Sequence, residues 1–169
     1  MLTGELGAGK TSVAIEVAHQ LDGLGIRNAV VDLDWLCWAG PDVTIEDLRQ
    51  LLQRNLSAVA ANLAEIGVTR IVLARALRDP ADRAAVEAAL PGSDLVVVRL
   101  LVEPAEALAR VQARDRGSEL DHIGAQADAI RTDVARTALA DLDVDNSDTR
   151  ALTAVATEVL HRTAWLPNP

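Results

Sequence analysis

The chain lacks phenylalanine and tyrosine and has a single cysteine among its 169 residues. Its core must therefore be aliphatic, and the only rings available for stacking are Trp35, Trp38 and Trp165. One cysteine, Cys37, cannot form an internal disulfide, and no basic and apolar leader precedes the first motif, which starts at residue 4. We therefore expect a cytoplasmic protein.

Long apolar runs are also missing, because no stretch reaches the roughly 18 residues that a membrane span needs. The net charge of −9 argues against a nucleic-acid partner, since most of the surface would repel a phosphate backbone. A local cluster of arginines could still bind a small anion. With 169 residues, 50% of them hydrophobic, we expect one well-buried core and a single domain over 1–169.

Lysine is the scarcest charge, because only one of the 16 lysine and arginine residues, Lys10, is a lysine. It lies in the stretch from Gly4 to Thr11, which matches the phosphate-binding pattern GxxxxGK[ST] in full. Arginine supplies every other positively charged side chain, so the lysine at this one position indicates that a compact charge on a flexible stem is needed there. The motif predicts a nucleotide-binding protein.

Each residue type in this loop has a physical reason. Gly7 and Gly9 allow successive backbone N–H groups to turn inward on a phosphate chain without a Cβ clash. Lys10 would bind the β- and γ-phosphates and the Thr11 hydroxyl would bind Mg²⁺, while the next helix offers its positive end. The predicted nucleotide-binding residues of this loop are Gly4, Glu5, Leu6, Gly7, Ala8, Gly9, Lys10, Thr11 and Ser12.

Helical and strand patterns alternate along the whole chain, which indicates an α/β fold with a parallel sheet. The expected strands are 28–34, 70–74, 94–102 and 142–145. The expected helices are 11–24, 44–66, 80–90, the segment from Pro104 onward, 122–138 and 149–163. Only Met1 to Thr3 precede the loop, so the first strand is either very short or continues upstream.

Two acids, Asp32 and Asp34, close the expected strand 28–34, at the edge where open parallel sheets bind ligands. Two residues apart on a strand, they would point to the same face. Asp32 would then hold Mg²⁺ and Asp34 would orient or deprotonate a hydroxyl group. A solvated pair of acids is the alternative. No acid follows the next strand, which ends at Arg75, and this argues against an ATP-driven machine with a Walker-B acid.

The chain resembles the P-loop small-molecule kinases, namely the shikimate, gluconate and adenylylsulfate kinase-like enzymes. The residues that carry the resemblance are Gly4 to Thr11, the strand end Val31 to Asp34, the helix Leu108 to Arg114 and the strand end Val144 to Ser147. The resemblance implies a three-layer fold with five parallel strands in the order 2-3-1-4-5. It also implies ATP, Mg²⁺ and transfer of the γ-phosphoryl group to a hydroxyl.

The same resemblance places a lid near residues 112–125. There Arg110 would bind the nucleotide, and Arg114 or Arg116 would stabilise charge on the transferring phosphoryl group, with Arg114 as the catalytic candidate. A solvated basic turn is the alternative. Shikimate kinases carry a glycine triplet where this chain has Ala74 to Ala76, which speaks against shikimate as the acceptor.

Four further side chains are candidates for the acceptor site. Arg75 and Arg78 would bind an anionic acceptor, although ion pairs to Asp79 or Asp82 are equally compatible with the sequence. The ring of Trp35, with Trp38 close by, would cover an acceptor that is partly apolar, and core packing is the alternative.

The sequence thus favours an ATP-dependent small-molecule phosphotransferase. Two alternatives remain open: an ATP-binding protein without transferase activity, and a nucleoside or nucleotide kinase. The acceptor and the oligomeric state are not indicated by any pattern in the chain.

Overall fold

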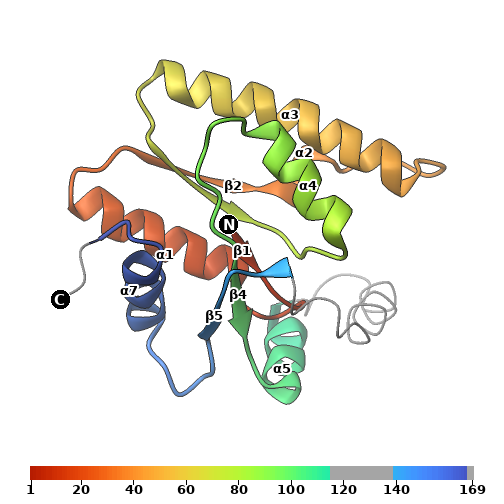
Figure 1. The fold of residues 1–169 in the computed structure, drawn as a ribbon. Coiled ribbons are helices and arrows are strands. Elements are labelled where there is room, and N and C mark those ends of the chain that lie inside the picture. Colours follow the sequence, from red (N-terminus) through yellow and green to blue (C-terminus); the bar gives the residue numbers. More distant parts are fainter. Residues whose placement is uncertain (115–138, 167–169) are drawn as a thin grey trace.

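A five-stranded parallel sheet forms the centre of the computed structural model, which describes residues 1–114 and 139–166 (Figure 1). The strand order is β2-β3-β1-β4-β5, as predicted, and β1 is very short. The strands are β1 (Leu2–Thr3), β2 (Asn28–Asp32), β3 (Arg70–Ala74), β4 (Val98–Leu101) and β5 (Leu142–Asp145).

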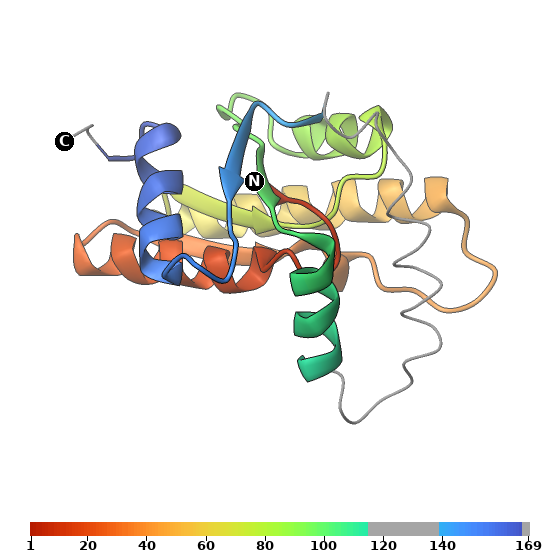
Figure 2. The ribbon, with the colours of Figure 1, turned by 90° about the horizontal axis from the view of Figure 1, so that it is seen from below.

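Helices cover both faces of the sheet and give the expected three layers. Figures 1 and 2 show α1 and α7 on one face and α3 and α4 on the other. The described helices are α1 (Lys10–Gly23), α2 (Leu33–Leu36), α3 (Ile45–Glu65), α4 (Pro80–Ala89), α5 (Pro104–Arg114) and α7 (Leu152–Arg162). The helix expected at 122–138 lies outside the described residues. None of the described helices is long and apolar enough to cross a membrane.

The core is aliphatic, as the composition predicts, and the sheet divides it into two clusters. Alternate residues of β3 show the division, because Val72 and Ala74 pack with α1 and α7 while Leu73 packs with α3 and α4. Cys37 is buried in the second cluster, which agrees with a structural role.

Two expected strands are shorter in the structure. The strand predicted to run to residue 34 ends at Asp32, because the Asp32 carboxylate accepts the backbone N–H of Asp34 and caps α2. The strand predicted at 94–102 spans only Val98–Leu101. Its neighbours explain this, since β1 and β5 both begin their pairing with Val98.

The long helix α3 begins as the sequence predicts. Thr44 and Asp47 form a capping box, in which the Thr44 side chain accepts the Asp47 N–H and the Asp47 carboxylate accepts the Thr44 N–H. The next helix, α4, begins with Asp79 as its N-cap and Pro80 in its first turn. The two capped helices, α3 and α4, lie on the same face of the sheet.

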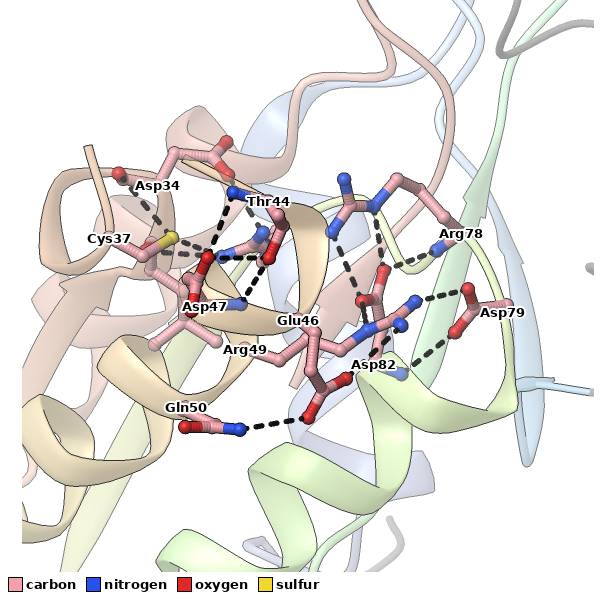
Figure 3. A network of polar contacts seen from close by, with 12 residues as sticks. Asp34, Cys37, Thr44, Glu46, Asp47, Arg49, Gln50, Arg78, Asp79 and Asp82 are labelled. Carbon is pink, nitrogen blue, oxygen red and sulfur yellow. Dashed lines mark hydrogen bonds and ion pairs between the residues drawn. The ribbon is translucent and has the colours of Figure 1, made fainter. Parts of the chain in front are cut away.

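A buried carboxylate, Asp82, ties α3 to α4 (Figure 3). It is 2% exposed and accepts from Arg49 Nε at 2.9 Å and from Arg78 Nε at 2.9 Å. Arg49 also pairs with Asp79, which caps α4. Burial raises the pKa of Asp82, but hydrogen bonds from Arg78 and Arg49 outweigh this effect and hold the pKa below its ordinary value.

We expect Asp82→Asn to lower the free energy of unfolding by about 3 kcal/mol, because it leaves two guanidinium groups facing a neutral amide. Urea unfolding at pH 7 measures the loss. Glu46→Gln is the matched control, since Glu46 is 66% exposed and lies 3.8 Å from Arg49, so its removal should change the stability by less than about 0.5 kcal/mol. Equal losses in the two variants would contradict a special role for the buried carboxylate.

The lowered pKa of Asp82 adds a pH dependence with a definite sign. The stabilisation is complete above the ordinary pKa of about 3.9 and is lost as the pH falls through the lowered folded value. The stability difference between the native chain and Asp82→Asn should therefore shrink on acidification below about pH 4. A difference that stays constant down to pH 2 would show that the ion pairs do not stabilise the fold.

Candidate active site

The predicted phosphate-binding loop connects β1 to α1, and its glycines are required by the surroundings. Gly7 and Gly9 both have φ of +82°, in the left-handed region. A Cβ on Gly7 would lie 2.3 Å from the Ala107 carbonyl oxygen of α5, and one on Gly9 would lie 2.6 Å from Asn146 Nδ2. Both the backbone conformation and the lack of space therefore exclude other residues here.

Lys10, the first residue of α1, bends back over the loop. Its Nζ donates to the carbonyl oxygens of Gly4 at 3.1 Å and Glu5 at 2.9 Å. An ammonium group with three donors can exchange these bonds for bonds to phosphate oxygens by rotating its stem. Thr11 and Ser12 follow with exposed side chains in the first turn of the same helix.

Thr11 and Asp32 lie together, as a shared magnesium site would require. The Thr11 hydroxyl donates to Asp32 Oδ2 at 3.2 Å, joining the start of α1 to the end of β2. No group of three or more histidine, cysteine, aspartate or glutamate side chains is arranged as a metal site within 1–114 and 139–166. Mg²⁺ is commonly held by one or two protein oxygens together with water and phosphate oxygens, and this pair fits that pattern.

Asp34 lies beside this pair but in α2, so the prediction that both acids lie on the strand is wrong. Its backbone N–H donates to Asp32 Oδ1 at 3.1 Å, and its own side chain projects from the first turn of α2, 62% exposed. Partial burial raises the pKa of the Asp34 carboxyl, Arg75 opposes this, and the charge of Asp32 adds to it. The two carboxylates are therefore close enough to interact electrostatically.

Arg75, predicted to contact the acceptor, is buried beneath α2. Its Nη1 donates to Cys37 Sγ at 2.6 Å and to the Leu33 carbonyl at 3.5 Å, and its Nε lies 3.6 Å from Asp34 Oδ1. These contacts tie Arg75 to the residues of α2 and its C-cap and leave the Nε of the guanidinium next to Asp34. Arg78 takes the alternative that the sequence left open and pairs with Asp82.

Arg110, predicted to bind the nucleotide, lies against the phosphate-binding loop. Its Nη1 donates to the Gly7 carbonyl at 3.4 Å, its Nη2 donates to the Asn146 carbonyl at 2.7 Å, and it pairs with Asp148 at 2.6 Å. Arg114 is the last residue of α5, and its side chain, like Arg116 and most of the predicted lid at 112–125, lies outside the described part of the chain.

Sequence reasoning missed two residues that hold the loop in place. Asn146 is buried and its Nδ2 donates to the Ala8 carbonyl at 2.8 Å, across 138 positions of sequence. Asp148 holds Arg110 against the same loop. The available signal was their position directly after β5, since the carboxyl ends of parallel strands share one edge of the sheet.

The two tryptophans after Asp34 are not part of the core. Trp35 and Trp38 are 75% and 77% exposed. Their rings stack on one another, with centroids 5.7 Å apart and planes inclined by 17°. Trp165 is separate from them and lies 5.6 Å from the guanidinium of Arg70.

Comparison with protein-family models and with curated proteins finds no match. Three solved structures with a similar fold are kinases. The Mycobacterium tuberculosis APS kinase CysC, in complex with AMPPNP and APS, is 24% identical with a TM-score of 0.68, covering 96% of this chain and 95% of that chain. A Bacteroides thetaiotaomicron shikimate kinase is 17% identical with a TM-score of 0.59, covering 96% of each chain.

The third is a gluconokinase from Sinorhizobium meliloti, 18% identical with a TM-score of 0.59, covering 97% of this chain and 91% of that chain. Identities this low show a shared fold rather than a shared substrate. The alignments run over nearly the full length of both chains in each pair. The chain therefore has the fold of the P-loop small-molecule kinases.

Proposed function

We propose that the chain is an ATP-dependent phosphotransferase that moves the γ-phosphoryl group to a hydroxyl of a small molecule. The observation that carries the proposal is the hydrogen bond from Thr11 to Asp32, which brings a strand-end acid to the phosphate-binding loop. Asp34 lies two residues further on, so a second carboxylate stands beside the place where the γ-phosphate would lie. A nucleotide-binding loop alone would not need this second acid.

Binding of the phosphates falls to the loop. The backbone N–H groups from Gly4 to Thr11 and the N-terminus of α1 favour a polyanion. Lys10 would exchange its two carbonyl partners for phosphate oxygens. Thr11 and Asp32 would hold Mg²⁺, and the chemistry that this ion supplies when bound is neutralisation of charge on the phosphate oxygens.

Asp34 would act on the acceptor. Its exposed carboxylate can accept the hydrogen bond of an incoming hydroxyl and take its proton as the new P–O bond forms. Arg75 lies beneath it and limits the directions in which the carboxylate can point. Arg114 and its neighbours in the predicted lid stay our candidates for stabilising charge on the phosphoryl group.

The role proposed for Lys10 predicts that both Lys10→Ala and Lys10→Arg reduce ATP-dependent turnover by at least about 10²-fold, the scale expected when one charge-stabilising donor is removed. The arginine variant should fail because a planar guanidinium cannot replace a compact ammonium inside the loop. ADP formation with Mg²⁺ and a panel of hydroxylated acceptors measures the effect.

Arg27→Ala is the matched control, since it also removes a positive charge. Arg27 precedes β2, at the end of the strands away from the phosphate-binding loop, and donates to the Ile66 carbonyl. Circular dichroism establishes that each variant is folded. Near-native turnover in either Lys10 variant would overturn the kinase proposal.

The two acids should fail in different ways. Asp32→Asn keeps the cap of α2, because an asparagine oxygen also accepts a backbone N–H, but it should weaken the Mg²⁺ dependence of ATP binding and of turnover. Asp34→Asn should lower turnover by about 10² to 10⁴ with little change in ATP affinity, and by less if the transition state is loose. Matched Mg²⁺ titrations of ATP binding check this, and the opposite pattern would mean that the roles are reversed.

A further inference from the structure

An exposed apolar surface follows the proposed catalytic acid directly along the chain. Ten large hydrophobic side chains are exposed in the described residues, and four of them, Trp35, Trp38, Val43 and Ile45, lie within residues 35–45. Two are the stacked tryptophans, which we call the tryptophan pair. Burial in the fold does not account for them, and Trp35 is the immediate neighbour of Asp34.

Three arginines on the same side of the sheet are already paired with acids. Arg75 is buried, and its Nε lies 3.6 Å from Asp34 Oδ1. Arg78 and Arg49 both donate to the buried carboxylate of Asp82 (Figure 3). Of the three, Arg75 is nearest to Asp34 and balances the carboxylate that would receive the acceptor's proton. To bind any of these three guanidinium groups, an anionic acceptor would have to take it from its partner.

The cost of moving a guanidinium group from its partner to a ligand differs among the three arginines. Moving Arg78 or Arg49 to a ligand would remove one of the two guanidinium groups that compensate the charge of Asp82, which is 2% exposed. Moving Arg75 would break its bonds to Cys37 and to the Leu33 carbonyl, which support the helix that carries Asp34. Binding a neutral ring on an exposed indole face disturbs none of these contacts.

We infer that the acceptor is an uncharged hydroxyl compound with an aromatic or other flat apolar part, which stacks on the tryptophan pair and places its hydroxyl at Asp34. This inference rests on the proposed phosphotransferase function and names its acceptor class. It separates the chain from kinases whose acceptors are acids, and it makes residues 35–45 the part of the chain that selects the acceptor. Stacking of one ring on another is expected to strengthen binding by about 2- to 10-fold.

The test uses two matched sets of compounds without nucleotide. The first set is phenyl β-D-glucopyranoside, methyl β-D-glucopyranoside and phenyl β-D-glucuronide, and the second is uridine, methyl β-D-ribofuranoside and uridine 5′-monophosphate. Within each set the second compound lacks the phenyl or uracil ring. The third compound carries an anionic group, which is a carboxylate in the glucuronide and a phosphate in uridine 5′-monophosphate. Binding is followed by the indole N–H resonances of the three tryptophans, assigned with single variants.

We expect Trp35 and Trp38 to shift with at least one neutral ring compound, which should bind about 2- to 10-fold more tightly than its ring-free partner and more tightly than its anionic partner. Trp165, beside Arg70, is an internal control and should not move. Equal or tighter binding of the anionic partners, no preference for a ring in either set, or a shift confined to Trp165 would each overturn the inference.

A kinetic arm links the surface to the reaction. For any ring compound that supports ADP formation, Trp35→Ala and Trp38→Ala should raise the KM for the acceptor by about 10-fold and leave the KM for ATP unchanged, whereas Trp165→Phe should change neither. An unchanged KM for the acceptor in both alanine variants would contradict the inference. Sedimentation of the same variants tests a rival occupant, since a loss of self-association without an effect on acceptor binding would assign the surface to a second copy of the chain.

The two proposals fail in distinguishable ways. Retained turnover in Lys10→Ala would overturn the phosphotransferase function, whatever the tryptophans do. Turnover that depends on Lys10 but prefers an anionic acceptor would overturn only the acceptor class.

Discussion

The Asp32 carboxylate makes the two contacts on which the candidate site depends. Its Oδ2 accepts from the Thr11 hydroxyl and joins β2 to the phosphate-binding loop. Its Oδ1 accepts the Asp34 N–H, which ends the strand and begins α2. The second contact places Asp34 and Trp35 in the short helix α2 rather than on the strand. One side chain thus positions both the candidate metal corner and the start of the candidate acceptor segment.

Local patterns predicted much of the fold, and long-range pairing accounts for what they missed. Stretches of about eight residues were enough to predict the phosphate-binding loop, the capping box at Thr44 and the buried run of β3. The strand order came from the resemblance to known kinases. The end of β2 was predicted two residues too late, because strand alternation and a capping aspartate look alike in sequence. The contact between Arg75 and Cys37 joins residues 38 positions apart, and no periodic pattern in the sequence predicts such a contact.

The use of one lysine among many arginines now has a structural counterpart. Arg49, Arg78 and Arg110 each donate in fixed directions to carboxylates, where a planar fork gains most. Lys10 instead donates to two backbone carbonyls of the loop itself, Gly4 and Glu5. An ammonium on a flexible stem can redirect its donors more easily than a planar guanidinium, which agrees with the phosphate-binding role proposed for Lys10.

The two core clusters separate the phosphate-binding loop from the candidate acceptor segment. The loop and α1 pack with the cluster on one face of the sheet, whereas α2, α3 and α4 pack with the cluster on the other face. The two halves meet in the sheet and at the Asp32 corner. The exposed side chains Trp35, Trp38, Val43 and Ile45 belong to neither cluster, whereas the loop packs against Ala107 and Asn146. Under the function proposed above, substitutions at these exposed positions would change the acceptor surface and leave the packing of the loop in place.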